Sequence, residues 1–346
     1  EVNIDSSLIK KAIDNINCGE YGEVHSMLIF KDDKLVLEEY FPGHRYNYFG
    51  ENHHGELTNW DASKLHDIKS VSKSVTSTCI GIAIDNGFIK SVNQSIFDYL
   101  PDHQNLKIDG KEKITIEHLL TMTSGLEWNE WKEYLSSKSN DIINIWFQEK
   151  DPVSFVLEKP LKNNPGTSFT YSSGNTIVLG EIIKNATGME LDKFSEEYLF
   201  KPLGIDSSYW GERYSNGVIE AGGGLEITPR DMVKIGVMYL NNGVSNGKRI
   251  LSKQWIENCT TVFANNKNID IPGHDSGIHS YSYSWWLKTY TNFGKIINMS
   301  HGVGWGGQEI IVLPELNTVV VFTGGNYTAT IKVIEMLEEY ILPAFD

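Results

Sequence analysis

The chain has 346 residues, of which 40% are hydrophobic and 11% aromatic, so it is long enough for two lobes and too apolar to be disordered. No apolar run reaches the roughly 18–20 residues that span a bilayer, so no transmembrane helix is predicted. The formal net charge of −15 disfavours binding to nucleic acids and to anionic membranes. Cys18, Cys79 and Cys259 are widely spaced, so neither a disulfide framework nor a structural zinc site is predicted.

The first sixty residues carry one helix signal, one hairpin signal and one loop signal. Residues 4–16 place apolar side chains at helical spacing and predict an amphipathic helix. Two β-rich runs around a charged turn at 31–34 predict a hairpin over 24–41. Residues 42–61 are polar and rich in glycine and histidine, which predicts a loop.

Helical signals dominate the middle of the chain, and strand signals return near its end. A helix over 328–342 closes the chain, after short β-like runs at 283–289, 295–299, 308–313 and 318–323. Strands at both ends pair most economically in one antiparallel sheet, so we predict an α+β fold in which the terminal helices cover this sheet. The sheet lobe then comprises residues 1–58 and 275–346. Residues 59–274 form an inserted, mainly helical lobe, with the active site at the junction.

Two serine motifs compete for the role of nucleophile. Ser-x-x-Lys occurs at Ser7, Ser70 and Ser245, and Gly-x-Ser-x-Gly occurs around Ser245. The second motif needs a strand before the serine and a helix after it, but a helix over 229–240 precedes Ser245 and no helical start follows. We therefore predict that Ser245 lies in a surface turn and that Ser7 lies in the N-terminal amphipathic helix.

Ser70 has a different context, because it begins a run of small and apolar residues. No charge occurs between Lys73 and Asp85, which predicts a buried central helix. In the first turn of that helix, the dipole and the free N–H groups favour developing negative charge on Ser70. Lys73 shares a face with Ser70, and burial can lower the pKa of a lysine enough for it to act as a general base. The alternative is that Ser70 caps the helix and Lys73 extends to solvent.

Two downstream loops could complete such a site. Residues 165–175 form a polar loop that contains Tyr171, whose phenol can relay protons; a packed tyrosine in a turn is the simpler interpretation. Residues 300–308 carry four glycines beside His301 and Trp305 and could expose N–H donors, as an oxyanion hole requires. A flexible hairpin turn is the alternative for this second loop.

Taken together and in this order, the Ser70–Lys73 motif, Tyr171 with Asn175 and the glycine loop resemble the serine β-lactamase/penicillin-binding-protein superfamily. Within it, they are similar to the class C-like branch of esterases, amidases and D-amino-peptidases. The Gly-Gly-Gln end of the glycine loop and Trp285-Trp286 resemble the 6-aminohexanoate-dimer-hydrolase-like subgroup. The resemblance covers nearly the whole chain, with supporting segments at 118–126, 165–171, 202–205, 220–225 and 229–231.

The resemblance implies a β-lactamase/DD-peptidase-like fold and a role for each matching residue. Ser70 would be the acylated nucleophile, Lys73 its base, and Tyr171 the group that carries the proton to the leaving group. The backbone N–H of Ser70 would be one oxyanion donor. Gly304 or Trp305 would supply the other.

Two departures from the family pattern bear on substrate binding. The family's asparagine two places after the tyrosine is Ser173 here, and Asn175 stands two places further on. The Lys-Thr-Gly of true β-lactamases is replaced by Ser300-His301-Gly302. We expect Ser173, Asn175, His301 and Gly302 to contribute to binding.

Three weaker candidates remain. Trp128 and Trp131 follow a Ser-Gly turn and could wall a pocket or simply pack as buried aromatic residues. The histidine pairs at 53–54 and 274/279 could bind a metal, but no carboxylate lies at zincin spacing, so loops and no metal are predicted. A trypsin-like fragment at 274–277 lacks the second glycine of that motif.

These features predict a serine hydrolase that cleaves a small-molecule amide or ester through an acyl-serine, without metal or cofactor. A penicillin-binding-protein-like D-amino-acid peptidase or a β-lactamase is the second hypothesis, and a non-catalytic ligand-binding sensor on the same fold is the third. No nucleic-acid partner is expected, and the oligomeric state is left open. The chain opens at Glu1 without a charged-then-apolar leader, so a removed targeting segment and a trimmed chain are both open; an exported location is favoured over a cytoplasmic one.

Overall fold

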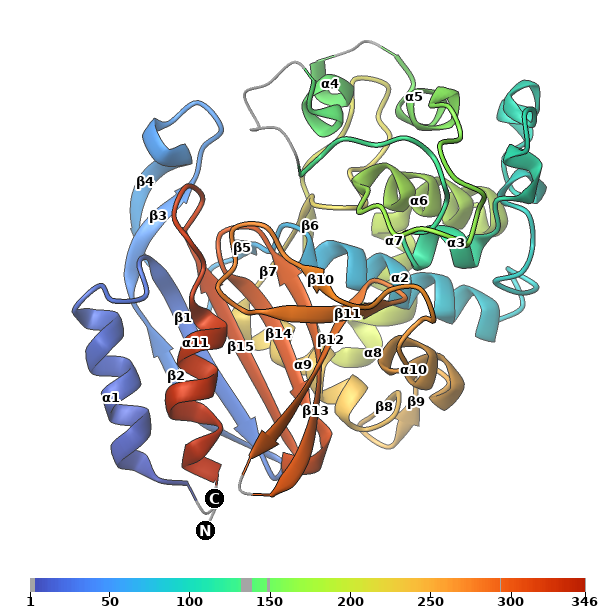
Figure 1. Cartoon of the computed structure of the whole chain (residues 1–346). Coiled ribbons are helices and arrows are strands. Elements are labelled where there is room, and N and C mark those ends of the chain that lie inside the picture. The colour runs from blue at the N-terminus through green and yellow to red at the C-terminus, as the bar shows by residue number, and fades with distance from the viewer. Residues whose placement is uncertain (1–3, 132–138, 148–149, 293, 346) are drawn as a thin grey trace.

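The computed structural model describes residues 4–131, 139–147, 150–292 and 294–345, which build one large antiparallel sheet with helices on both faces (Figure 1). The sheet has eight strands in the order β10-β11-β12-β13-β14-β15-β1-β2. Their bounds are β1 Val24–Lys31, β2 Lys34–Tyr40, β10 Ile269–Asp270, β11 Ile278–Ser282, β12 Trp285–Asn292, β13 Lys295–Gly304, β14 Gln308–Leu313 and β15 Thr318–Gly324.

The two ends of the chain meet inside this sheet. β1 pairs antiparallel with β15, so that Val24 lies opposite Gly324 and Lys31 opposite Thr318. The strands near the centre are continuous apolar runs because both of their faces are covered, which is typical of buried strands. The prediction of one antiparallel sheet built from both ends of the chain is confirmed.

The terminal helices cover one face of the sheet. Helix α1 is Ser6–Asn17, and helix α11, Val333–Met336, continues as a π-helical turn over Leu337–Ile341; Figure 1 shows α1 and α11 side by side. Alternate residues of β15 divide between the two sides: Val320 packs in the cluster under these helices, and Val321 packs in the cluster on the other side. The last helix begins later than the predicted residue 328.

Helices of the middle segment cover the opposite face. Helix α2, Val71–Asp85, is buried along its whole length from Val71 to Ala83, as its composition predicts. It packs between β13 and helix α6, Ser173–Thr187, while helix α9, Pro229–Leu240, packs on β14 and β15. The sheet and α2 therefore position the serine that begins this helix.

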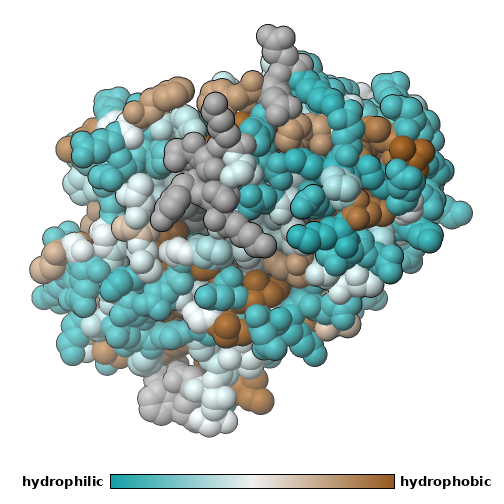
Figure 2. Space-filling model, turned by 45° about the horizontal axis from the view of Figure 1, so that its top comes forward, coloured by the Kyte–Doolittle hydropathy of each residue, from teal (hydrophilic) through white to brown (hydrophobic). Residues whose placement is uncertain are grey.

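The remaining elements are short. The other α-helices are α3 Ile116–Leu120, α4 Asp141–Phe147, α5 Pro152–Glu158, α7 Leu191–Ser195, α8 Lys201–Leu203 and α10 Lys253–Thr260. The other strands are β3 Pro42–Tyr46, β4 His54–Asn59, β5 His66–Asp67, β6 Tyr209–Trp210, β7 Leu225–Ile227, β8 Val244–Ser245 and β9 Lys248–Arg249. None of the helices in the described ranges combines the length and apolarity needed to cross a bilayer. The face drawn in Figure 2 is mainly hydrophilic, with apolar side chains in small separate groups.

The prediction of a loop over residues 42–61 is wrong. This segment forms the hairpin of β3 and β4, with Pro42 opposite Asn59. Its strands carry mostly polar, partly exposed side chains, so composition resembled that of a loop. The connecting turn holds Asn52 and His53 at positive φ, a conformation that short polar side chains adopt more readily than most.

Ser245 and Ser7, which the sequence analysis rejected as nucleophiles, lie in the kinds of segment that it predicted. Ser245 ends the two-residue strand β8, which forms a small hairpin with β9 through a turn with Asn246 and Gly247 at positive φ. Ser7 lies in the first turn of α1, and its hydroxyl donates to Asp5. Neither has the strand-to-helix setting of a nucleophile elbow.

Candidate active site

Ser70 lies at the N-terminus of the buried helix α2, three residues after the end of the short strand β5. Lys69 precedes it with a φ of 47°, a left-handed conformation that is uncommon for lysine and recurs at functional sites. The Asp67 carboxylate stabilises this turn by accepting from the Lys69 backbone N–H at 3.0 Å and pairing with its ammonium at 2.5 Å. The Ser70 hydroxyl makes no capping hydrogen bond, so the helix-cap alternative is wrong and the oxygen is available for chemistry.

Lys73 places its side-chain nitrogen directly beside that hydroxyl. Its Nζ donates to Ser70 Oγ at 2.9 Å and to the Gly222 carbonyl at 2.7 Å. The side chain is buried rather than extended to solvent. Burial lowers the pKa of Lys73, while the carboxylates of Glu130 and Glu220 oppose that shift. A lysine of this kind can give up its proton and act as a base toward the serine.

Tyr171 completes the predicted group of three. The Lys73 nitrogen lies 5.0 Å from the centre of its ring. The ring belongs to an aromatic stack with Trp131, at 4.6 Å between centroids, and Trp286, at 6.0 Å. Burial raises the pKa of Tyr171 well above its ordinary value, so the phenol is neutral at neutral pH and can pass a proton on. The structure thus brings together the three residues that the sequence singled out.

Glu220 is a buried acid beside Lys73. The sequence analysis noted it only within the supporting segment 220–225. Its Oε1 accepts from the backbone N–H of Gly222 at 2.8 Å, and Tyr214 donates to its Oε2. Burial raises the pKa of Glu220 to about 8, even though Lys73 acts to lower it. Gly222 joins the two groups, because its carbonyl binds Lys73 and its N–H binds Glu220.

Glu130 is a second acid that the sequence did not point to. Ser173 holds it with two hydrogen bonds of 2.7 Å, from its backbone N–H and from its hydroxyl. The indole of Trp128 donates a third at 2.8 Å. Ser173, expected to bind substrate, and Trp128, expected to wall a pocket, therefore orient Glu130. No spacing rule links residues 130 and 173, so only the fold reveals the pair.

These residues open into a cavity of about 1020 Å³. Ser70, Glu130, Tyr171 and Glu220 line it, and the larger part of its surface is apolar. Its aromatic walls come from seven separate stretches of the chain: Tyr46, Tyr48, Phe49, Trp131, Trp146, Phe147, Tyr171, Trp286, Trp305 and Tyr327. Trp131 thus lines the cavity, which was one of the two alternatives that the sequence left open. An apolar cavity with a few converging polar groups is the usual form of a small-molecule site.

The cations on the cavity wall are already paired. Among the described residues that line it, the lysine and arginine are Lys69 and Arg213. Lys69 pairs with Asp67 and lies 3.4 Å above the ring of Tyr46. Arg213 binds Asp192 at 2.8 Å. The wall also carries Glu212, and burial raises the pKa of this carboxyl to about 7.

Several residues expected to bind substrate lie behind the wall instead. His301 is fully buried on β13, with Nδ1 2.7 Å from Glu309 Oε2, and burial lowers its pKa to about 3. Gly302 faces α2, where an added Cβ would lie 3.0 Å from the Ser74 hydroxyl. Asn175 is buried in α6 and donates to the Met122 sulfur. Within the described chain, none of these three lines the cavity.

The end of β13 lies close to the segment that precedes the nucleophile Ser70. Gly304 passes so close to the chain before Ser70 that an added Cβ would lie 2.4 Å from the Ile68 carbonyl oxygen. Val303 and Trp305 line the cavity on either side of this glycine. His301 lies two residues before Val303 on the same face of β13, but it is fully buried against Glu309 and does not line the cavity. The assignment of the second oxyanion donor to Gly304 or Trp305 stays a prediction.

The acids beside Lys73 lead to a prediction about pH dependence. Glu220→Gln is expected to move the acid limb of the kcat/KM profile to lower pH. In its ionised form Glu220 stabilises the ammonium form of Lys73, and without that carboxylate the lysine loses its proton at lower pH. The profile should be measured with a p-nitrophenyl ester, beside Glu257→Gln on the exposed face of α10 as the control. An acid limb that stays in place or moves to higher pH would contradict a basic role for Lys73.

The comparisons with known proteins agree with this geometry. A model of the beta-lactamase family matches residues 24–329. The 6-aminohexanoate-dimer hydrolase of Paenarthrobacter ureafaciens is 29% identical over 266 residues, which cover 74% of this chain and 65% of that protein. A protein of Salmonella agona (strain SL483), provisionally named a D-alanyl-D-alanine carboxypeptidase, is 28% identical over 185 residues, which cover 52% of this chain and 41% of that protein.

A solved structure supports the fold over nearly the whole chain. A Bacillus anthracis protein, provisionally named a 6-aminohexanoate-dimer hydrolase, superposes with a TM-score of 0.75 at 20% identity and covers 95% of this chain and 81% of its own. The chain spans about two thirds of the Paenarthrobacter relative and less than half of the Salmonella one. At the level of the family, the expectation of a hydrolase is confirmed. Since the family model spans most of the chain, the protein belongs to the β-lactamase family.

Proposed function

We propose that this protein is a serine hydrolase that cleaves an amide or ester bond of a small molecule through an acyl-serine intermediate. The observation that carries the proposal is the 2.9 Å contact between Lys73 Nζ and Ser70 Oγ at the N-terminus of a buried helix. A nucleophile within hydrogen-bond reach of a base with a lowered pKa is the arrangement that covalent catalysis requires.

The reaction follows from this geometry in two halves. Neutral Lys73 takes the Ser70 proton while Oγ forms a bond to the substrate carbonyl carbon. The Ser70 N–H and an N–H near residue 304 stabilise the oxyanion. As the bond to the leaving group breaks, Tyr171 passes it the proton that Lys73 holds, which leaves an acyl-Ser70. Water then attacks the ester, and the same groups return the proton to Ser70.

The cavity favours certain substrates over others. Its aromatic wall suits an apolar acyl chain, and the carboxylate of Glu130 disfavours an anionic group nearby. Because Lys69 and Arg213 are paired with acids, neither is freely available for a substrate carboxylate. A neutral or cationic amide or ester therefore fits best.

Because no cation on the described cavity wall is free to bind a carboxylate, we expect β-lactams to be poor substrates. The kcat/KM for nitrocefin, which carries a carboxylate, is expected to be about ten- to a hundredfold below that for p-nitrophenyl butyrate. A lost charge-assisted contact costs about 1.5–3 kcal/mol. Ser300 stands where the family has its lysine, and the neighbouring His301 is buried against Glu309 and cannot supply that contact. Both substrates should be measured on one preparation. Nitrocefin turnover equal to that of the ester would move the assignment to β-lactams, and turnover of neither would favour a ligand-binding sensor.

A peptidase acting on D-amino-acid peptides is the second candidate. The similarity to the Salmonella protein, which is provisionally named a carboxypeptidase, extends over about half of this chain and supports the peptidase hypothesis. The same similarity supports a location in the cell envelope, which fractionation of cells that express the full-length gene would test. Release of D-alanine from a D-alanyl-D-alanine peptide at a rate above that of ester hydrolysis would favour this candidate.

A further inference from the structure

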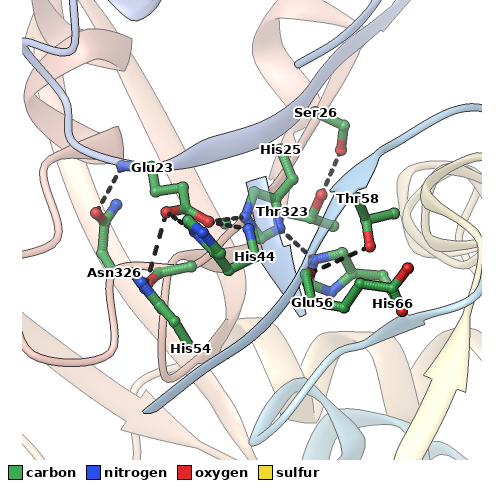
Figure 3. A network of polar contacts seen from close by, with 12 residues as sticks. Glu23, His25, Ser26, His44, His54, Glu56, Thr58, His66, Thr323 and Asn326 are labelled. Carbon is green, nitrogen blue, oxygen red and sulfur yellow. Dashed lines mark hydrogen bonds and ion pairs between the residues drawn. The ribbon is translucent and has the colours of Figure 1, made fainter. Parts of the chain in front are cut away.

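A cluster of histidines and one carboxylate lies beside the β3–β4 hairpin, outside the reacting group of three. Glu23 directly precedes β1, His44 lies on β3 and His54 begins β4 (Figure 3). One side-chain ligand atom from each of the three lies within 4.8 Å of the other two. The side chains are 21%, 36% and 25% exposed respectively, so an ion in solution can reach them. The spacing along the chain gave no sign of this group, because the fold alone brings residues 23, 44 and 54 together.

The distances suit a small divalent cation. Glu23 Oε2 lies 3.0 Å from His44 Nδ1 and 3.8 Å from His54 Nε2. Ligands of a tetrahedral zinc ion, with bonds of about 2.0–2.1 Å, lie about 3.3 Å apart. The two observed separations fall on either side of that value. Two imidazoles and one carboxylate form a common ligand set of zinc and similar transition metals.

The carboxylate is already oriented for this role. Glu23 Oε1 accepts from His25 Nε2 at 2.9 Å and from the backbone N–H of His44, which leaves Oε2 toward the two histidines. An added Cβ at Gly43 or at Gly325 would lie 2.8 Å from Oε1, so two glycines make room for the carboxylate. Contacts of this kind behind a ligand orient it and raise its affinity for metal.

A chain of buried histidines lies behind the carboxylate. His25 Nδ1 lies 2.7 Å from His66 Nε2, and His66 Nδ1 lies 3.0 Å from the Asp67 carbonyl. These contacts fix the His25 ring, and through it the orientation of the Glu23 carboxylate.

We propose that Glu23, His44 and His54 bind a divalent transition-metal ion, with Zn²⁺ as the best fit. The ion would join the start of β1 to both strands of the hairpin that contributes Tyr46, Tyr48 and Phe49 to the cavity wall. Its role is to hold that wall in place, and the reacting group lies elsewhere.

Binding requires local rearrangement of the rings. His44 and His54 stack at 4.6 Å with 7° between their planes, so both rings must turn to aim at a common ion. His54 Nε2 lies 2.8 Å from the Gly325 carbonyl, and its proton must move to Nδ1 before this nitrogen can bind metal. Protonated imidazole cannot coordinate, so acid weakens binding.

The test is a titration of the tag-free, metal-stripped full chain with ZnCl₂ by calorimetry, beside His54→Gln and the double variant His44→Gln/His54→Gln. Glutamine retains an amide that can donate to the Gly325 carbonyl, which protects the fold. We expect one site per chain in the wild type, weakened at least about a hundredfold in the double variant. Thermal unfolding should shift upward with Zn²⁺ in the wild type and not in the double variant.

His53→Ala is the matched control, because His53 adjoins His54 on the same turn without belonging to the cluster. It should bind Zn²⁺ as the wild type does. Co²⁺ in place of Zn²⁺ should give the intense visible bands of a tetrahedral site, lost in the double variant. Absence of a stoichiometric site in the wild type would overturn the proposal. So would equal affinity in the double variant, or loss of binding in His53→Ala alone.

Discussion

Replacement of Ser70 by alanine is expected to lower kcat for a p-nitrophenyl ester by roughly 10⁴- to 10⁶-fold, the range seen when a hydrolase loses its nucleophile. The same variant should no longer be labelled by a fluorophosphonate. The reason is that, among the serines that the structure describes, Ser70 alone combines a base 2.9 Å from its Oγ with a position at the N-terminus of a buried helix. Intact mass after labelling, followed by peptide mapping, measures this result directly.

Ser245→Ala and Ser7→Ala are the matched controls, because both serines share the Ser-x-x-Lys spacing with Ser70. Each should keep wild-type turnover and labelling. A label mapped to Ser245, or a Ser70→Ala enzyme with near-normal turnover, would overturn the assignment and restore an α/β-hydrolase interpretation.

Loss of either proton-carrying group is expected to have the next largest effect. Lys73→Ala and Tyr171→Phe should each lower kcat by about a hundredfold or more, since a positioned acid or base contributes about 10²–10⁴-fold. Phenylalanine keeps the ring that stacks on Trp131, so Tyr171→Phe removes the hydroxyl with little change in packing. Steady-state kinetics with one ester, together with thermal unfolding of each variant, separate a catalytic loss from a folding loss.

Lys10→Ala, on the exposed surface of α1, is the control for removal of a lysine. The double variant Lys73→Ala/Tyr171→Phe should lose little more than the worse single variant, because the two residues act as one unit. If either single variant turned over at a near-normal rate while remaining folded, the base would have to lie elsewhere.

Much of the fold was predictable because its periodicities are strong. The apolar run after Ser70 has no charge on any face, and only a central helix can bury such a run. Helix α9 begins at Pro229 and ends at Leu240, where the proline start and the Asn-Asn-Gly that follows predicted its bounds. The β3–β4 hairpin was missed because its strands are short and mostly polar, so the sequence shows no alternation of apolar and polar residues there.

The site was only partly predictable. Ser70 and Lys73 lie at the start of helix α2, and Tyr171 lies just before helix α6. Helix starts of this kind can be recognised from the sequence. Glu130 left none, because its role depends on Ser173 reaching it across the fold. His301 was expected in the cavity, but it is fully buried on β13 against Glu309, and such burial cannot be assigned from a glycine-rich sequence alone.

The pairing of β1 with β15 constrains how the molecule is made. Ser26 and Thr323 share a 2.6 Å hydrogen bond although they are 297 residues apart in the chain. At about 5–20 residues per second, a ribosome completes β15 roughly 15–60 s after β1 has been synthesised. During that interval the β1–β2 hairpin has an open edge and an apolar face that its permanent neighbours cannot yet cover. The nascent chain therefore has to be shielded from aggregation, and the central sheet closes only when synthesis is nearly complete.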